Sequence, residues 1–162
     1  MIAALQNSAT GLPDTNVRLD PRRVAQQERS LQQACTAARV LEDYRGQETL
    51  VLDLTAITPI VDYFVITTST SNRQMRAMAD EVNRALKQVG SQRRGFEGGE
   101  STTWVLQDYG DIVVHVFTPE GRKLYDLEHL WADAPRIDWK SRVAAAPVPL
   151  PESRALPVEP TE

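Results

Sequence analysis

Two aspartates near the middle of the chain, Asp108 and Asp111, have the type and spacing that most directly suggest chemistry. They flank Tyr109 and Gly110, which fit a two-residue turn between two apolar runs. Two carboxylates across such a turn repel each other unless a cation, a donor group or solvent lies between them. The pair could hold a cation or substrate, recognise Lys or Arg on a partner, or cap the turn through backbone amides.

His115 is the next candidate, because it lies in the apolar run VVHVF. The only other histidine, His129, lies in a different segment. In the expected hairpin, His115 is about 13 Å along the strand from Asp111, too far for both to bind one metal ion. No nucleophile or activated water is identifiable beside it. His115 is therefore either packed or hydrogen-bonded beside Trp104, or part of a protein interface.

The polar loop 67–71 joins an expected strand to an expected helix, a position at which phosphates often bind. It has no glycine and no Gly-Lys-Ser/Thr ending, which excludes a P-loop. We expect Ser71 to accept from the amide of Gln74, and Gln74 to reach back to the amide of Ser71, as a capping box. The Gly-x-Ser-x-Gly and His-Glu-x-x-His motifs are also absent. We therefore expect no catalytic residues, no cofactor and no metal.

The chain is acidic, with a formal charge of −4 and a pI near 5.3. Nucleic-acid-binding proteins normally have a basic surplus, so phosphate binding is disfavoured as the main activity and no direct DNA binding is expected. Residues 95–121 contain five acids and neither Lys nor Arg. That field suits a basic protein partner, although a solvated surface without a partner would have the same composition. The acids are Glu97, Glu100, Asp108, Asp111 and Glu120.

No stretch approaches the ~20 apolar residues that a membrane helix needs. The N-terminal segment lacks the basic start and apolar stretch of a secretory signal, and Asp14 and Asp20 argue against a transit peptide. The single cysteine, Cys35, excludes an internal disulfide and a multi-cysteine metal site. We expect its small side chain to be buried, and the protein to be cytoplasmic with no membrane partner.

The segments that position these residues alternate between helical and strand patterns. The order α-β-β-α-β-β-β-α predicts a mixed α/β fold, one β-sheet flanked by helices. Asp20-Pro21 could cap an earlier start of the first helix. The expected elements are a helix at about 28–45, strands at 49–54 and 61–69, a helix from Ser71 to Gly90, a short strand at 94–97, the hairpin 102–119 and short helical turns after Pro119.

The expected hairpin is apolar on both faces, so each face needs a covering. Helices can cover one face, and a partner or second copy could cover the other. With Tyr109 and Gly110 at the turn, the pairs are Asp108 with Asp111, Leu106 with Val113 and Trp104 with His115. One face then holds Trp104, Leu106, Val113, His115 and Phe117; the other holds Val105, Gln107, Ile112, Val114 and Val116.

Two tryptophans, Trp104 and Trp131, lie in and just after the hairpin. In a sheet domain such large side chains are usually part of the core. Tryptophan is also enriched at interface hot spots, so an anchoring role stays open for both.

The ends differ in composition from the middle. Residues 141–162 hold five of the ten prolines, which predicts a disordered, Pro/Ala-rich tail. Residues 1–27 are expected to be a flexible N-terminal extension. The folded domain is then expected at 28–140.

Several blocks of sequence occur in an order that is more specific than any one of them. They are Asp62-Tyr63-Phe64-Val65-Ile66, Ser71-x-Arg73-Gln74, Glu97-Gly98, Trp104, Asp108-x-Gly110-Asp111-x-Val113-Val114-His115 and Tyr125-x-Leu127-Glu128-x-Leu130-Trp131. Over roughly residues 34–134 the chain closely resembles the ribosomal silencing factor family RsfS, also called Iojap-like proteins. Ser69 stands where this family usually has glycine, which argues against a ligand role for the loop before the second helix.

The resemblance implies a fold like that of the nucleotidyltransferases, without enzymatic activity. It implies binding to the large ribosomal subunit through its protein fourteen, a basic protein on the subunit-joining face. There the family sterically blocks the small subunit and represses translation under nutrient limitation. Homodimers are also implied, since members of the family often form them.

Residues and resemblance together give a hypothesis for the partner site. We expect Trp104, Val113 and His115 at the centre of the contact, with Glu97, Glu100, Asp108 and Asp111 at its charged rim. A ribosome-assembly or scaffold factor without silencing is an alternative. So is a magnesium-dependent nucleotidyltransferase, which would need paired carboxylates soon after a Gly-Ser element. The next acids after Ser69 are Asp80 and Glu81, which lie in mid-helix and face adjacent directions.

Overall fold

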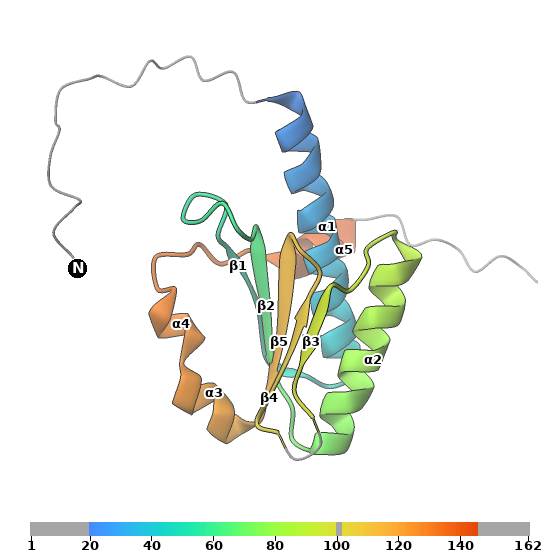
Figure 1. Ribbon diagram of the computed structural model, residues 1–162, viewed down its shortest axis with the longest axis vertical. Helices are drawn as coiled ribbons and strands as arrows, with labels where there is room; N and C mark the ends of the chain where they lie inside the picture. The colour runs from blue at the N-terminus through green and yellow to red at the C-terminus, as the bar shows by residue number, and fades with distance from the viewer. Residues whose placement is uncertain (1–19, 100–101, 146–162) are drawn as a thin grey trace, which may run out of the picture.

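Five strands form one mixed sheet with helices on both faces in the computed structural model, which describes residues 20–99 and 102–145 (Figure 1). The strand order is β1-β2-β5-β4-β3. The central strands β2 and β5 are parallel, and the other neighbouring pairs are antiparallel. The strands are β1 Gln47–Asp53, β2 Tyr63–Thr68, β3 Gly95–Glu97, β4 Trp104–Asp108 and β5 Ile112–Phe117. The mixed α/β sheet expected from the sequence is thereby confirmed.

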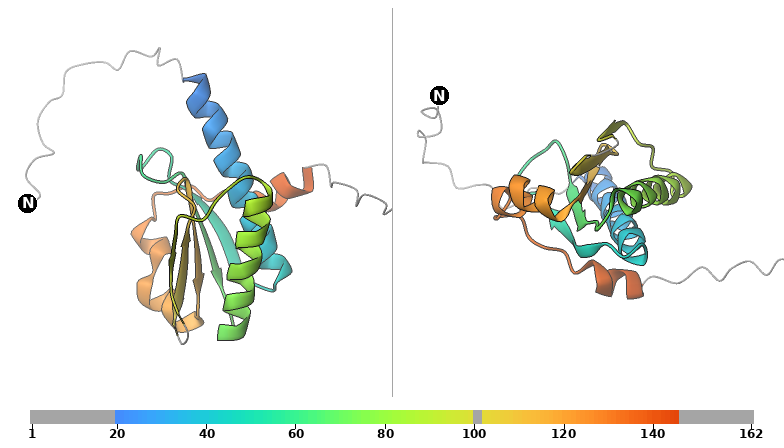
Figure 2. Two further views of the ribbon diagram at one scale, coloured as in Figure 1. Left: turned by 45° about the vertical axis from the view of Figure 1, so that its right-hand side comes forward. Right: turned by 90° about the horizontal axis from the view of Figure 1, so that it is seen from below.

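The helices divide between the two faces of the sheet (Figures 1 and 2). The long helices α1 and α2 lie side by side on one face, and the short helices α3 and α4 lie on the other. Helix α5 packs against α1. The helices are α1 Pro21–Asp43, α2 Asn72–Gln88, α3 Pro119–Tyr125, α4 Leu127–Leu130 and α5 Trp139–Ala145. Within the described residues, no helix has both the length and the apolar character needed to cross a membrane.

Side chains close the starts of both long helices. The Asp20 carboxylate accepts from the amide of Arg22 at 3.0 Å, and Pro21 occupies the first helical position, where its missing N–H costs nothing. The Ser71 hydroxyl accepts from the amide of Gln74 at 3.1 Å, as expected. The return bond differs, because the Gln74 side chain accepts from the amide of Thr70, at 2.8 Å, and not from Ser71.

Two apolar clusters hold the layers together. The larger lies between the sheet and α1 and α2, and includes the fully buried Leu41, Val65, Met78 and Val114. The smaller lies under α3 and α4, and its most buried members are Leu52, Leu54, Ile66 and Phe117. The β4–β5 hairpin is therefore covered by α1 and α2 on one face and only partly covered by α3 and α4 on the other, where Trp104 and Val113 stay half-buried.

The register of the hairpin corrects the expected one. Asp108 pairs with Val113, Leu106 with His115, and Trp104 with Phe117. The turn lies at Gly110 and Asp111, because Tyr109 is only 5% exposed and its hydroxyl bonds to Asn83 of α2. Gly110 supplies the positive φ, +90°, that such a tight turn requires. Each face of the hairpin still carries the side chains expected on it.

Both expected boundaries of the folded part move outward. Helix α1 includes residues 21–27, which we expected to be flexible, because the Asp20 cap starts the helix there. Helix α5 includes residues 141–145, which we assigned to the disordered tail. Trp139 anchors this helix, since it is 5% exposed and its indole N–H donates to the carbonyl of Thr49 at 3.3 Å. The remainder of both expected tails, 1–19 and 146–162, lies outside the described residues.

Candidate partner-binding face

The sheet face opposite α1 and α2 carries most of the residues selected from the sequence. We call it the aromatic face, because six rings from three strands and the α3–α4 segment gather there. They are Phe64, Trp104, His115, Phe117, Tyr125 and Trp131.

Close ring contacts fix the positions of these side chains. Trp104 stacks on Phe117, with ring centroids 5.1 Å apart. Its ring also contacts that of Tyr125, with centroids 4.5 Å apart. Phe64 meets Trp131 edge to face at 5.7 Å. Each such pair contributes about 0.5–1.5 kcal/mol beyond the area it buries. The face is therefore set in place before any partner arrives.

His115 is buried behind Trp104, with 3% of its surface exposed. Its Nδ1 accepts a hydrogen bond from the indole N–H of Trp104 at 3.2 Å. Burial lowers the pKa of His115 to about 3, so the imidazole is neutral and carries its proton on Nε2. Of the two interpretations, the structure supports hydrogen bonding beside Trp104. Trp104 and its neighbours cover the ring, so a contact of His115 with a partner stays a prediction that its burial in the free chain does not favour.

A buried arginine holds the α3–α4 segment on the sheet. The side chain of Arg122 donates to Glu128 at 2.7 Å, to the hydroxyl of Thr68 at 2.9 Å and to the carbonyl of Glu48 at 2.9 Å. Only 10% of this side chain is exposed. Gly121 lets α3 lie close to the backbone before β4, because a Cβ at this position would lie 2.4 Å from the carbonyl oxygen of Thr103. These contacts position Tyr125 and Trp131.

The short helices leave apolar side chains in solvent. Leu124 is 76% exposed, Leu130 is 69% exposed and Tyr125 is 44% exposed. Trp104, Leu106 and the expected site residue Val113 are half-buried. Exposed apolar side chains that adjoin aromatic residues of such a face in the sequence are typical of an interaction site. The leucines were missed from the sequence, although the run LYDLEHLW holds more apolar residues than two short helices can bury.

The expected acidic rim is only partly assembled. Glu97 is exposed and pairs with Leu106, so it lies on the aromatic face. Asp108 lies on the same face and caps the turn, its carboxylate accepting from the amide of Gly110 at 2.7 Å. Asp111 lies apart, because its carboxylate accepts from Gln26 of α1 at 3.2 Å. Glu100 lies outside the described residues.

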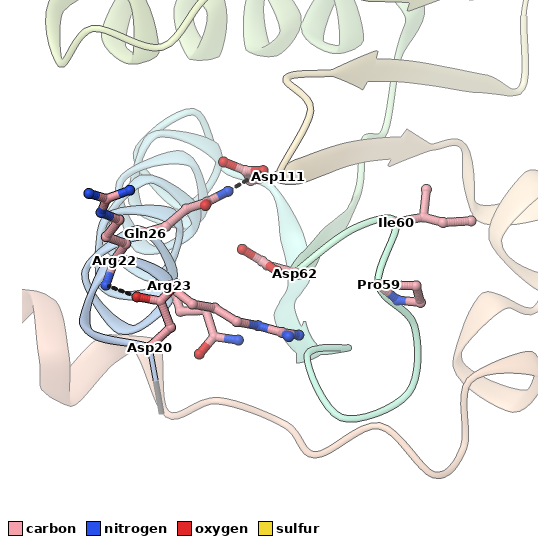
Figure 3. Close-up of a pocket in the computed structure, with 9 residues that line it drawn as sticks. Asp20, Arg22, Arg23, Gln26, Pro59, Ile60, Asp62 and Asp111 are labelled. Atoms are coloured by element: carbon pink, nitrogen blue, oxygen red, sulfur yellow. Dashed lines mark hydrogen bonds between the residues drawn. The ribbon is translucent and has the colours of Figure 1, made fainter. Parts of the chain in front are cut away.

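Asp111 instead borders a shallow cavity of about 370 Å³ between the start of α1 and the loop before β2 (Figure 3). Asp20 and Asp62 also line it, together with Arg22 and Arg23. Burial is the main cause that raises the pKa of Asp62, and the nearby charge of Asp111 adds to it. Because charges of both signs line the cavity, it has no strong preference for an anion or a cation.

The loop before α2 is closed by its own hydrogen bonds. Ser69 is fully buried and its hydroxyl donates to the carbonyl of Ser71 at 2.6 Å. Asp80 is exposed on α2, and Glu81 pairs with Arg84. Among the described residues, no group of three or more His, Cys, Asp or Glu side chains is placed to hold a metal ion.

Comparison with known proteins gives a consistent set of relatives. Residues 27–156 match the model of the family described as ribosomal silencing factor during starvation, RsfS. The ribosomal silencing factor RsfS of Bacillus subtilis is 41% identical over 102 residues, which are 63% of this chain and 86% of that protein. A mouse protein named mitochondrial assembly of ribosomal large subunit protein 1 is 33% identical over 91 residues, 54% of this chain and 40% of its own. A crystal structure of a Chromobacterium violaceum protein has a TM-score of 0.60 and 40% identity, covering 62% of this chain and 84% of that one.

Proposed function

The chain is a member of the ribosomal silencing factor family RsfS, and on this premise we propose that it represses translation by keeping the ribosomal subunits apart. It binds the large subunit on the face that receives the small subunit. Bound there, it occupies the space that the small subunit would take and so prevents the two subunits from joining. This repression acts under nutrient limitation. No bond is made or broken, so the action needs a stable complex and no catalytic group.

The aromatic face is the surface that we assign to this contact, with the basic protein fourteen of the large subunit as its partner. The observation that carries the proposal is the incomplete cover of this face, because Trp104 and Val113 are half-buried and Tyr125, whose ring lies 4.5 Å from that of Trp104, is 44% exposed. Interface hot spots are enriched in such tryptophans, surrounded by contacts that exclude water. Glu97 and Asp108 add negative charge at the edge of the face, which complements a basic partner.

Rigidity supports the assignment of Trp104 as the central anchor. Its ring is fixed by Phe117 and Tyr125, and its indole N–H by His115. A side chain already held in its bound position loses little conformational entropy on association. We therefore assign the direct contact to Trp104 and Val113, and a supporting role to His115.

The test is a subunit-joining assay on a sucrose gradient with purified protein. We expect the wild-type chain to lower the fraction of joined ribosomes, and Trp104→Ala to weaken binding to the large subunit about 30- to 900-fold, or ~2–4 kcal/mol. Phe96→Ala is the matched control, because Phe96 is an aromatic residue, 47% exposed, on the opposite face of the sheet. Undiminished joining at saturating wild-type protein would refute the silencing function, and full activity of Trp104→Ala would refute the site.

A homodimer in the cytoplasm completes the proposal. The exposed leucines of α3 and α4 adjoin Tyr125 and Trp131 of the aromatic face in the sequence, so a second copy that covers them would compete with the large subunit. Sedimentation of the wild type and of Leu124→Ser/Leu130→Ser tests this. We expect the wild type to sediment as a dimer and the variant as a monomer. A wild-type chain that is still monomeric at roughly 100 micromolar, a concentration at which even weak specific complexes form, would contradict the homodimer.

Assembly of the large subunit is a second candidate function, because a mouse relative is named for that role. An assembly factor would also bind the large subunit, so binding alone does not separate the two functions. Deletion of the gene separates them. Assembly predicts incomplete large-subunit particles during rapid growth, whereas silencing predicts normal particles that stay joined under starvation.

A further inference from the structure

The solvent-facing side of α2 carries a regular row of basic side chains. We call Arg73, Arg76, Arg84 and Lys87 the basic stripe; Asp80 lies within it. These five positions are spaced i, i+3, i+7, i+11 and i+14, which places them within about 80° of one another around the helix and over about 21 Å of its length. All five are exposed.

The stripe lies in the most basic part of an acidic chain. Residues 72–94 contain six Arg and Lys residues against two acids, whereas the whole chain has a net charge of −4. Arg93 extends the stripe at its C-terminal end, because it lies close enough to Tyr109 to affect its pKa, and Tyr109 bonds to Asn83 of α2. Arg93 also stacks on Phe96, with its guanidinium 4.8 Å from the ring centroid.

The charges of the stripe are only partly neutralised inside the molecule. Arg84 is held by Glu81 through two donors of its guanidinium. Within the part of the chain that the structure describes, Arg73 and Lys87 lie in no ion pair. The stripe therefore offers cations at both of its ends to an external polyanion.

We infer that the basic stripe binds the phosphate backbone of RNA. Phosphate oxygens accept from Arg and Lys, and from the amide side chains that flank the stripe at Asn83 and Gln88. An acidic protein fits less well, because the side chains between the cations are small or polar, as at Ala77, and offer no apolar anchor. The choice of RNA over DNA rests on the proposed action at the ribosome.

The stripe and the aromatic face are independent surfaces. Helix α2 covers the sheet face opposite α3 and α4, so the two surfaces point away from each other (Figure 2). The protein can therefore bind a basic protein on one side and an RNA on the other. The overall charge of −4 disfavours nucleic-acid binding, but it hides this local excess of the opposite sign.

The test measures binding of the full chain to a fluorescent 20-base-pair RNA duplex at several KCl concentrations. Each phosphate contact contributes about 0.7–0.9 to the slope of log K against log salt. The variant Arg73→Gln/Lys87→Gln should therefore bind about tenfold or more weakly at 50 mM KCl and have a slope shallower by about 1.4–1.8. In amide NMR spectra of the wild type, the duplex should shift residues of α2 and the loop that follows it.

A second pair of arginines provides the matched control. Arg29 and Arg39 are exposed on α1, and Arg39→Gln/Arg29→Gln removes the same charge without touching the stripe. We expect this control to bind the duplex more tightly than the stripe variant, because its arginines lie on the neighbouring helix and not on the solvent-facing side of α2. Equal losses in the two variants, no binding of the wild type at 50 mM KCl, or tighter binding to a DNA duplex of the same sequence would each overturn the inference.

The result is separable from the test of the proposed function. Trp104→Ala should bind the RNA duplex as the wild type does. The stripe variant should bind isolated protein fourteen of the large subunit with unchanged affinity. Loss of RNA binding in Trp104→Ala would overturn the assignment to α2, whereas failure to block subunit joining would affect only the silencing proposal.

Discussion

At the scale of single residues, His115 shows how a polar group can stabilise a binding surface without touching the partner. Its ring lies among Phe64, Trp104 and Phe117, and its Nδ1 orients the indole of Trp104. A charged imidazolium could not accept that hydrogen bond and would be costly to bury. The histidine therefore acts as a neutral acceptor throughout the physiological pH range.

This burial predicts a specific loss of stability in acid. The pKa of His115 is about 3 in the folded chain, below its ordinary value of 6.5, so only the unfolded chain takes up a proton between these values. The stability that the neutral His115 contributes to the free energy of unfolding is fully present above pH 6.5. It is lost as the pH falls below that value, by about 1.4 kcal/mol per pH unit. Between pH 7 and pH 5 the wild type should lose about 2 kcal/mol of unfolding free energy more than His115→Asn, measured by urea denaturation.

Asparagine is a suitable comparison because its side-chain oxygen can accept from Trp104 and it does not titrate. The carboxylates of the chain titrate in both proteins, so their effect cancels in the difference. Parallel curves for the two proteins would mean that the folded histidine is protonated near its ordinary pKa. Binding to the large subunit should not change between pH 6 and pH 8 through this residue.

At the scale of elements, α3 and α4 depend on one arginine for their position. They are too short to be stable alone, and their link at Asp126 adopts a left-handed conformation, with φ +42°. Arg122 joins this segment to the ends of β1 and β2 through Glu48 and Thr68. The aromatic face therefore depends on an interaction at its border.

Removing this interaction should be costly. Arg122→Ala leaves the buried hydroxyl of Thr68 without its donor and leaves Glu128 only its longer ion pair with Arg136, at 3.6 Å. We expect a loss of about 2–4 kcal/mol in the free energy of unfolding. Urea denaturation followed by tryptophan fluorescence measures it. Lys123→Ala, an exposed neighbour, should change stability by less than about 0.5 kcal/mol. Similar losses in both variants would show that Arg122 does not hold the segment.

Local patterns were sufficient to predict most elements of the fold. Each long helix starts at a capping side chain, Asp20 or Ser71, and the central strands β2 and β5 are runs rich in β-branched and aromatic residues. The hairpin register was wrong because the position of the turn depends on a distant contact, Tyr109 against α2. The end of the fold was wrong for a similar reason, since Trp139 reaches back to Thr49.

The candidate site was less predictable than the fold. Which side of the hairpin each residue faces follows from strand alternation, so Trp104 and Val113 were placed on the correct face. Burial of His115 and separation of Asp111 from Asp108 depend on packing between remote segments, including Gln26 of α1. The run LYDLEHLW indicates that some apolar residues stay exposed, but which of them do so, Leu124 and Leu130, depends on how α3 and α4 pack on the sheet.

At the scale of the whole molecule, the uneven distribution of charge should control how fast the partner is found. Glu97 and Asp108 border the aromatic face, whereas basic side chains lie on α2 at the other side of the sheet. Opposite charges across an interface mainly raise the association rate and make it sensitive to salt. A basic partner should therefore approach from the acidic edge.

The variant Glu97→Gln/Asp108→Asn tests this orientation. It keeps the turn, because an asparagine oxygen can still accept from the amide of Gly110. We expect association with the large-subunit protein to slow by roughly three- to tenfold at low salt, with a smaller change in the dissociation rate, in stopped-flow measurements. Glu42→Gln/Asp43→Asn on α1 is the control of equal charge, and an equal slowing there would show that only net charge matters.

The parallel pairing of β2 with β5 also bears on how the chain is made. The two strands at the centre of the sheet, Tyr63–Thr68 and Ile112–Phe117, pair with each other. Their paired residues are therefore synthesised about fifty residues apart. A nascent polypeptide cannot complete the sheet until Phe117 has left the exit tunnel. The chain should therefore acquire its native form only late in its own production, after most of its domain has been translated.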